Sequence, residues 1–339
     1  MDSSRQGRQS LLFLQPPSIL SYASAVGKKE SEGPLGNCFD FCAQDTTLGQ
    51  KSWEKAETAL QRTAISLALQ KAGLTDAAID AAFLGDLLNQ CVGSSFTMRN
   101  LGVPTLGLYG ACSTMAEGLL LAGMAVSGGF CRKTLTVSSS HFASSERQYR
   151  FPLNYGGQRT PTAQWTVTGA GAVVLGQAGE GLHLCSGTIG TIVDRGITDA
   201  SNMGAAMAPA AYETLRAHFD DLHRAPEDYD LIVTGDLGRL GWELVRELFE
   251  RDGVRLGERY QDCGMMIFDL NRQDVRCGGS GCGCSASVLC GHLLGRMERQ
   301  ELRRVLFCGT GALLSPLTTQ QGESIPAVCH AVEIRSRGE

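Results

Sequence analysis

The chain has 339 residues, of which 43% are hydrophobic and 19% are charged, and its formal net charge is −5. This length predicts two packed units of about 150 residues each, and the charge argues against a nucleic-acid partner, which needs a broad basic field. There is no secretory signal pattern and no apolar run of the roughly 20 residues that span a membrane. The thirteen cysteines are therefore expected to be free thiols in a reducing compartment.

The first half of the chain is predicted to alternate helices with buried strands. Residues 1–50 are rich in Gly, Pro and Ser, and we interpret them as an irregular arm with one short strand at 11–14. Apolar residues at helical spacing then predict a helix over 53–72, which ends at Gly73. Further along the chain we predict a helix at 113–127 and strands at 80–86, 104–109 and 133–138.

The second half of the chain repeats this scheme. Segment 226–236 is laid out like segment 75–86, because each runs from an acidic stretch through apolar residues to a Gly-Asp-Leu sequence. Gly283-Cys-Ser285 resembles Ala111-Cys-Ser113, and each tripeptide opens a predicted helix that leads to a strand. Ordered matches of this kind indicate internal duplication. We therefore predict an α/β protein with two duplicated halves, 51–180 and 181–339, whose mixed, mostly parallel sheets pack in layers.

Cys112 is the first candidate for chemistry. It lies where the predicted helix 113–127 begins, and unpaired N–H groups and the helix dipole favour a thiolate there. A nucleophilic cysteine in acyl transfer needs an acid or base partner, and His141, just after the following strand, is the best placed histidine. A buried structural thiol at Cys112 and a satisfied loop histidine at 141 remain open alternatives.

A second candidate feature is a basic and aromatic segment that follows His141. Within thirteen positions this segment contains three arginines, Arg147, Arg150 and Arg159. Together with Tyr155 they would form an anion clamp with an aromatic wall, although arginines on a loop are more commonly solvated surface. Asp86, Cys112 and His141 each follow a predicted strand, so three loops are expected to converge on one pocket at the carboxyl ends of the strands.

These motifs resemble the thiolase-like superfamily and, more closely, the stage V sporulation protein AD family. The segments that carry the resemblance include Gly85-Asp-Leu-Leu-Asn-Gln90, Tyr109-Gly-Ala-Cys-Ser-Thr114, Ser139-Ser-His141, Glu146-Arg-Gln148, Tyr155-Gly-Gly-Gln158, Gly279-Ser-Gly-Cys282 and Thr310-Gly-Ala-Leu-Leu-Ser-Pro316. The resemblance implies a thiolase-like fold, a homodimer, no cofactor, and a role in moving dipicolinic acid into the developing spore. It also implies a place on the cytoplasmic side of the spore inner membrane, held there by other stage V sporulation membrane proteins of the same operon.

Two departures from the enzymes of the superfamily bear on activity. Ketoacyl synthases of type III carry a His-x-Ala-Asn stretch where this chain has Val233-Thr-Gly-Asp-Leu237. Thiolases carry Gly-His-Pro where this chain has Cys277-Gly-Gly-Ser-Gly-Cys282. Cys112 is thus retained without the downstream histidines of its relatives, and we expect a degenerate pocket that binds a ligand instead of condensing acyl groups.

The leading hypothesis is a pocket that binds dipicolinate (pyridine-2,6-dicarboxylate), alone or with calcium. Backbone N–H groups at the Cys112 turn would meet one carboxylate, an arginine would meet the other, and Asp86 and Asn89 would contact any calcium. The residues assigned to this pocket are Asp86, Asn89, Cys112, Ser113, His141, Arg147, Arg150, Tyr155 and Arg159. Two alternatives stay open: an acyltransferase that uses Cys112 with His141 as its base, and a scaffold that docks the spore membrane channel.

Overall fold

The computed structural model describes residues 4–149, 158–177 and 179–336. Up to residue 177 the strands are β1 (Arg5–Gln6), β2 (Ser10–Leu12), β3 (Ser18–Val26), β4 (Phe41–Cys42), β5 (Ala81–Gly85), β6 (Thr105–Gly107), β7 (Lys133–Ser140), β8 (Trp165–Thr166) and β9 (Gly169–Gly176). The helices of this half are α1 (Lys28–Ser31), α2 (Trp53–Lys71), α3 (Val92–Met98), the 3-10 turn η4 (Ala111–Ser113), α4 (Thr114–Ser127) and α5 (Phe142–Tyr149).

The second half contains a matching set of elements. Its strands are β10 (Leu182–Thr188), β11 (Leu231–Thr234), β12 (Tyr260–Asp262), β13 (Gly279–Ser280), β14 (Arg304–Ala312) and β15 (Ala327–Ser336). Its helices are α6 (Met203–Leu222), α7 (Gly238–Arg251), α8 (Cys263–Met266), α9 (Cys282–Val288), the π-helical turn η8 (Leu289–Leu293), α10 (Leu294–Glu298) and α11 (Pro316–Gln320).

The strand order confirms the predicted duplication. The first half has the order β6-β5-β7-β9-β3 and the second half has the equivalent order β12-β11-β14-β15-β10, and β10 pairs with β3 to join the two. The prediction of a mixed α/β fold is therefore confirmed. The boundary at 180/181 falls between β9 and β10, but its meaning as a domain boundary stays a prediction, because one core cluster contains side chains from both halves.

The expectation that most neighbouring strands run parallel was wrong, because antiparallel pairs slightly outnumber parallel pairs along the main strand path. Along the main strand path, β5 runs parallel to β6 and β7, and β11 runs parallel to β12 and β14, whereas the five other neighbouring pairs are antiparallel. Parallel neighbours require a crossover, usually a helix. The segment 313–326 between β14 and β15 holds only the short helix α11, so β15 returns antiparallel.

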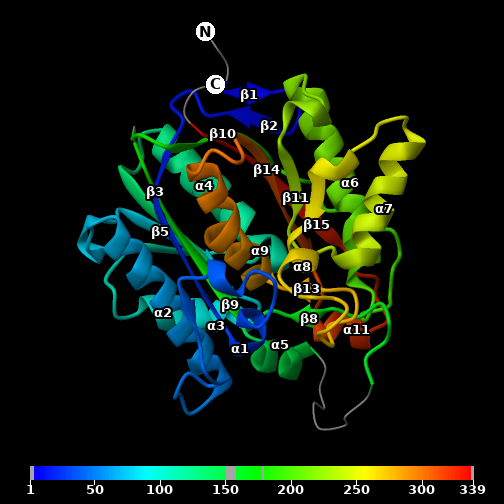
Figure 1. Cartoon of the computed structure of the whole chain (residues 1–339), viewed down its shortest axis with the longest axis horizontal. Helices are drawn as coiled ribbons and strands as arrows, with labels where there is room; N and C mark the ends of the chain where they lie inside the picture. Colours follow the sequence, from blue (N-terminus) through cyan, green and yellow to red (C-terminus); the bar gives the residue numbers. More distant parts are fainter. Residues whose placement is uncertain (1–3, 150–157, 178, 337–339) are drawn as a thin grey trace.

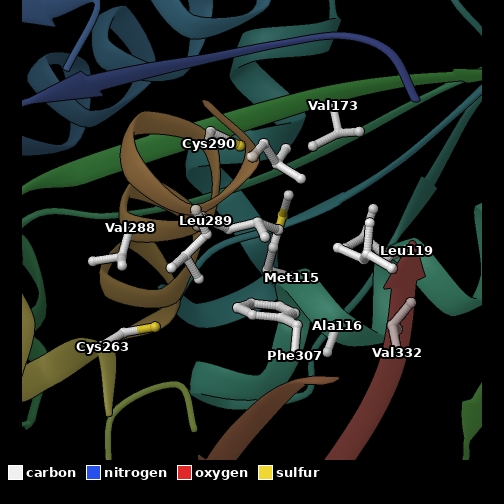
Figure 2. Packing of buried hydrophobic residues seen from close by; sticks show 14 of the residues in the cluster. Met115, Ala116, Leu119, Val173, Cys263, Val288, Leu289, Cys290, Phe307 and Val332 are labelled. Carbon is white, nitrogen blue, oxygen red and sulfur yellow. The ribbon is translucent and has the colours of Figure 1, made fainter. Parts of the chain in front are cut away.

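Helices and strands are stacked in alternating layers (Figure 1). Helix α2 covers the outer face of the first-half strands, α6 and α7 cover the second-half strands, and α4 and α9 lie between the two sets. Figure 2 shows the core around these central helices, where Met115 and Leu119 from α4 gather with Leu289 and Cys290 from η8. This buried middle layer fixes the position of the turn that opens α4.

The prediction for residues 1–50 was wrong in one respect, because β3 lies in the middle of the sheet between β9 and β10. Its sequence, Ser18-Ile-Leu-Ser-Tyr-Ala-Ser-Ala-Val26, has a serine at every third position and lacks the continuous apolar run expected of a buried strand. The serines are satisfied inside the fold: the Ser21 hydroxyl donates to the Ala68 carbonyl at 2.7 Å, and the backbone N–H of Ser24 donates to Asp40 at 2.9 Å. Hydrogen bonds to residues outside the strand thus permit their burial.

Most of the other predicted elements are confirmed near their predicted bounds. The helix over 53–72 is α2, the helix over 113–127 is α4, and the strands near 80–86, 104–109 and 133–138 are β5, β6 and β7. All thirteen cysteines are free. Among the described helices, none combines the length and the apolar character needed to cross a bilayer.

Candidate functional site

Cys112 lies in a tight turn at the start of a helix, as the sequence predicted. The turn η4 joins β6 to α4, and Ala111 within it has a left-handed backbone with φ of 49°, which is unusual for a residue with a side chain. Strand β14 passes directly against the turn: a Cβ on Gly311 would lie 2.3 Å from the Gly110 carbonyl oxygen and 3.3 Å from the Cys112 nitrogen. Only a glycine permits this close approach, so β14 holds the turn in place.

A cavity of about 90 Å³ opens beside Cys112. This is several times the ~10–15 Å³ in which one water molecule fits. The residues that line it come from both halves of the fold, and they are Leu87, Tyr109, Ala111, Cys112, Ser145, Glu146, Tyr149, Thr166, Ala200, Met203, Ser280, Ala312 and Leu314. The lining is mostly apolar with a few polar side chains, which is typical of a small-molecule site.

Asp236 lies next to the Cys112 thiol, within reach of a hydrogen bond. Its buried carboxylate accepts hydrogen bonds from the Thr310 hydroxyl at 2.8 Å, the Gly281 N–H at 2.8 Å and the Ser280 hydroxyl at 3.2 Å. Burial, followed by the charge of Asp236, raises the pKa of Cys112 well above its usual value. The thiol is therefore protonated at neutral pH, in contrast to the thiolate expected from its place at a helix start.

Segment 277–282 contributes Ser280 to the cavity wall. Gly281 has a left-handed φ of 98°, and its N–H points at Asp236. The next residue, Cys282, is fully buried and its thiol donates to the Ser139 carbonyl at 2.9 Å. Burial, followed by the charges of Glu57 and Asp86, raises the pKa of Cys282 well above its usual value, so this thiol is also protonated.

His141 is not directed at Cys112. Its Nε2 lies 2.7 Å from the Thr46 carbonyl and must donate there, and its Nδ1 accepts from the Ala143 N–H at 3.2 Å. The ring is buried, and burial lowers its pKa, so it is neutral with both nitrogens occupied. His141 is absent from the cavity wall and lies at the start of α5 in a structural role.

Three more of the predicted site residues are placed around the cavity, outside its wall. The buried carboxylate of Asp86 accepts from the Ser94 N–H at 2.7 Å, the Ser94 hydroxyl at 2.6 Å and the Leu88 N–H at 2.9 Å, which fixes the chain entering α3. The Ser113 hydroxyl donates to the Gly110 carbonyl at 2.7 Å. Asn89 is exposed and lines an adjoining hollow of about 320 Å³ that shares Tyr109, Tyr149 and Leu314 with the cavity.

The structure places Arg147 and Arg159 in different surroundings. Arg147 is half exposed, pairs with Glu54 and lies over the Trp53 ring, so it points away from the cavity. Arg159 is largely buried and lies behind the wall, where it pairs with Glu146 at 3.3 Å and stacks on Trp165. Arg150 and Tyr155 lie outside the described residues, so their predicted roles stay predictions.

The residues that the sequence analysis missed come from two segments. Asp236 directly follows β11 and belongs to the repeated Gly-Asp-Leu sequence. The repeat and the position at the carboxyl end of a parallel strand could have identified Asp236 as a site residue from the sequence. Ser145, Glu146 and Tyr149 share one face of α5 and line the cavity. The spacing of these three residues fits one face of a helix. The sequence analysis assigned the binding role of this segment to its arginines instead, on the basis of their charge.

The family model for stage V sporulation protein AD matches residues 7–335. Stage V sporulation protein AD from Bacillus subtilis (strain 168) is 45% identical over 332 residues, which are 98% of this chain and 98% of that protein.

Solved structures of condensing enzymes share the fold at low sequence identity. A variant of OleA from Xanthomonas campestris is 17% identical, with a TM-score of 0.62 and 99% of each chain covered. The 3-oxoacyl-(acyl carrier protein) synthase III from Aquifex aeolicus VF5 is 13% identical, with a TM-score of 0.56 and 94% of this chain and 99% of that chain covered. These likenesses confirm the thiolase-like fold, and the match over nearly the whole length shows that the chain belongs to the stage V sporulation protein AD family.

Proposed function

We propose that the cavity beside Cys112 binds dipicolinate and that the protein serves uptake of this ligand into the developing spore. The observation that carries the proposal is a cavity at the Cys112 turn, where burial and the adjacent carboxylate of Asp236 raise the pKa of the Cys112 thiol. A cavity with a mostly apolar wall and a few polar groups suits a flat aromatic ring with polar ends. Membership of the sporulation family supports the choice of ligand.

Binding is supported over acyl transfer by the protonation of Cys112. An acyl-transferring cysteine must become a thiolate, either by its position or through a neighbouring base. Here burial and Asp236 both oppose the thiolate, and His141 is occupied by the Thr46 carbonyl and the Ala143 N–H. We therefore expect no acyl adduct on Cys112 after incubation with acyl-CoA thioesters of several lengths, as measured by intact mass.

The charges around the cavity bear on how a dianion is held. Among the described residues no lysine or arginine lines the wall directly. Glu146 lines it, and Arg159 behind Glu146 offsets its charge across 3.3 Å. We therefore expect the ligand to accept hydrogen bonds mainly from neutral donors within the cavity. Because the ligand is negatively charged, its affinity should depend on the ion pair between Arg159 and Glu146, which offsets the charge of Glu146.

The direct test is a calorimetric titration of the full chain with dipicolinate, with and without calcium. The cavity-filling variant Ala312→Phe places a ring in the space next to the turn and is expected to abolish the binding heat. The control variant Leu317→Ala changes a side chain that is 63% exposed and absent from the wall, and it should bind like the wild type. An absence of heat for the wild type at millimolar ligand, with and without calcium, would remove the proposal.

The homodimer and the attachment to spore membrane proteins remain proposals. Strand β6 ends the described strand path, and Leu106 in it is 55% exposed, so its edge is open to pairing with another chain. Sedimentation of the wild type beside Leu106→Asp tests the dimer. We expect a dimer for the wild type and a shift towards monomer for the variant, and a monomeric wild type would contradict it.

A further inference from the structure

The hydroxyl of Ser145 stands out among the polar groups around the cavity. Ser145 lies on α5, is 2% exposed and lines the cavity, yet its buried Oγ has no hydrogen-bond partner among the residues that the structure describes. Buried polar groups in native proteins almost always have partners, and an exception asks for an explanation. A buried hydroxyl beside a cavity that has no partner within the described protein is available to donate a hydrogen bond to a ligand.

The neighbouring polar groups already have partners within the protein. The Ser280 hydroxyl donates to Asp236 at 3.2 Å, and the Tyr149 hydroxyl donates to the Leu87 carbonyl at 2.6 Å while it accepts from Tyr109 at 2.7 Å. Glu146 pairs with Arg159. Ser145 therefore differs from these groups in that its hydroxyl can turn towards a ligand without breaking a bond.

A buried serine on α5 can have a hydrogen-bond partner, as the adjacent Ser144 shows. Ser144 is equally buried, and its hydroxyl donates to the Glu57 carboxylate at 2.9 Å. Two successive serines on one helix thus differ in their surroundings: the Ser144 hydroxyl is hydrogen-bonded within the core, and Ser145 lies at the cavity wall without a described partner. Ser287 also has a buried hydroxyl without a partner, but it is absent from the cavity wall.

We propose that the Ser145 hydroxyl donates a hydrogen bond to one carboxylate of the bound ring and makes the site prefer a dicarboxylate to a monocarboxylate. Pyridine-2,6-dicarboxylate carries its two carboxylates on either side of the ring nitrogen, so a ring with one carboxylate at the Cys112 turn can direct the second towards α5, which also lines the cavity. A hydrogen bond to a charged acceptor is stronger than a neutral one. This inference rests on the proposed function, because it names a contact within the same cavity.

The test measures affinity and stability for the wild type, Ser145→Ala and the matched control Ser144→Ala. Titrations use pyridine-2,6-dicarboxylate and pyridine-2-carboxylate, which lacks one carboxylate. We expect Ser145→Ala to bind the dicarboxylate about 10- to 100-fold more weakly and the monocarboxylate nearly as the wild type does. Its thermal midpoint without ligand should stay unchanged or rise, since an unsatisfied buried hydroxyl is removed. Ser144→Ala should lower the midpoint and keep the preference between the two ligands.

The outcomes separate this inference from the proposed function. If the wild type binds dipicolinate and Ser145→Ala retains the same affinity and the same preference, the inference is wrong while the function stands. An equal loss for both ligands, or a thermal midpoint lowered as in Ser144→Ala, would assign Ser145 a structural role and also overturn the inference. A wild type that binds no dipicolinate overturns the function and, with it, this contact.

Discussion

The contact between Asp236 and Cys112 predicts a specific change in thiol reactivity. In Asp236→Asn the negative charge is removed, while the side chain keeps an oxygen for the Gly281 N–H and an amide that faces the Thr310 hydroxyl. A unit charge about 4 Å away in surroundings with an effective dielectric constant of about 20 is worth roughly 4 kcal/mol. At about 1.4 kcal/mol per factor of ten, this corresponds to a thiolate fraction of Cys112 that is higher by up to ~1000-fold at a given pH, because the removal of the charge lowers the pKa.

The assay is the rate of alkylation by iodoacetamide between pH 7 and pH 10, followed at the Cys112 peptide by mass spectrometry. Cys38 is exposed in the same molecule and serves as an internal reference. In the wild type, Cys112 should react much more slowly than Cys38, because burial and Asp236 both raise its pKa. In Asp236→Asn its rate relative to Cys38 should rise by about 10- to 1000-fold, as the thiolate fraction does. An unchanged ratio would refute the argument that Asp236 holds the thiol protonated.

Three further predictions concern the frame of the site. Gly311→Ala should be strongly destabilising and should lower ligand affinity, since its Cβ would lie 2.3 Å from the Gly110 carbonyl; a thermal midpoint equal to that of the wild type would contradict this. Burial raises the pKa of Glu57 to about 8, so the free energy of unfolding should fall as the pH rises from about 4.5 to about 8, by at most ~1.4 kcal/mol per pH unit. Chemical denaturation should show a shallower fall in Glu57→Gln, and equal slopes would count against a neutral buried Glu57. Arg147→Ala removes a half-exposed ion pair and should change the unfolding free energy by less than about 1 kcal/mol and leave the dissociation constant for dipicolinate unchanged.

The sign of the Glu57 effect follows from where its proton is held. In the folded protein the carboxyl stays protonated up to about pH 8, with hydroxyls of Ser139 and Ser144 at 3.0 and 2.9 Å. In the unfolded chain it loses the proton near its ordinary pKa of 4.5. Between these values the folded state binds the extra proton, so its stability is complete below about pH 4.5 and declines as the pH rises.

The sequence predicted the repeated helices and strands because their apolar periodicity is strong. The helix α2 and the strands β5 and β7 were found near their true bounds for this reason. Strand β3 was missed because its serines are satisfied by partners such as the Ala68 carbonyl, far away in sequence. The Cys112 turn could also be found, since the Gly-Ala-Cys-Ser-Thr stretch carries both the turn and the helix start.

The chemistry of the site was harder to predict because it depends on contacts between the two halves. Asp236 lies more than 100 residues after Cys112 in the sequence, so their contact could not be predicted from spacing. Burial and the charge of Asp236 raise the pKa of Cys112, whereas the position of Cys112 at a helix start would lower it. Charge alone suggested that Arg147 and Arg159 face a ligand, but Glu54 and Glu146 pair with them. Ser145 carries no sequence signal of its own, since the adjacent Ser144 is identical in type and differs only in what surrounds it.

The central claim is that the cavity at the Cys112 turn holds dipicolinate without covalent chemistry. A crystal structure of the full chain grown with saturating dipicolinate tests it most directly. We predict a flat ring within the cavity lined by Cys112, Ser145 and Met203, with the Cys112 thiol unmodified and still beside Asp236. An empty cavity with the ligand bound elsewhere, or a covalent adduct on Cys112, would contradict the claim.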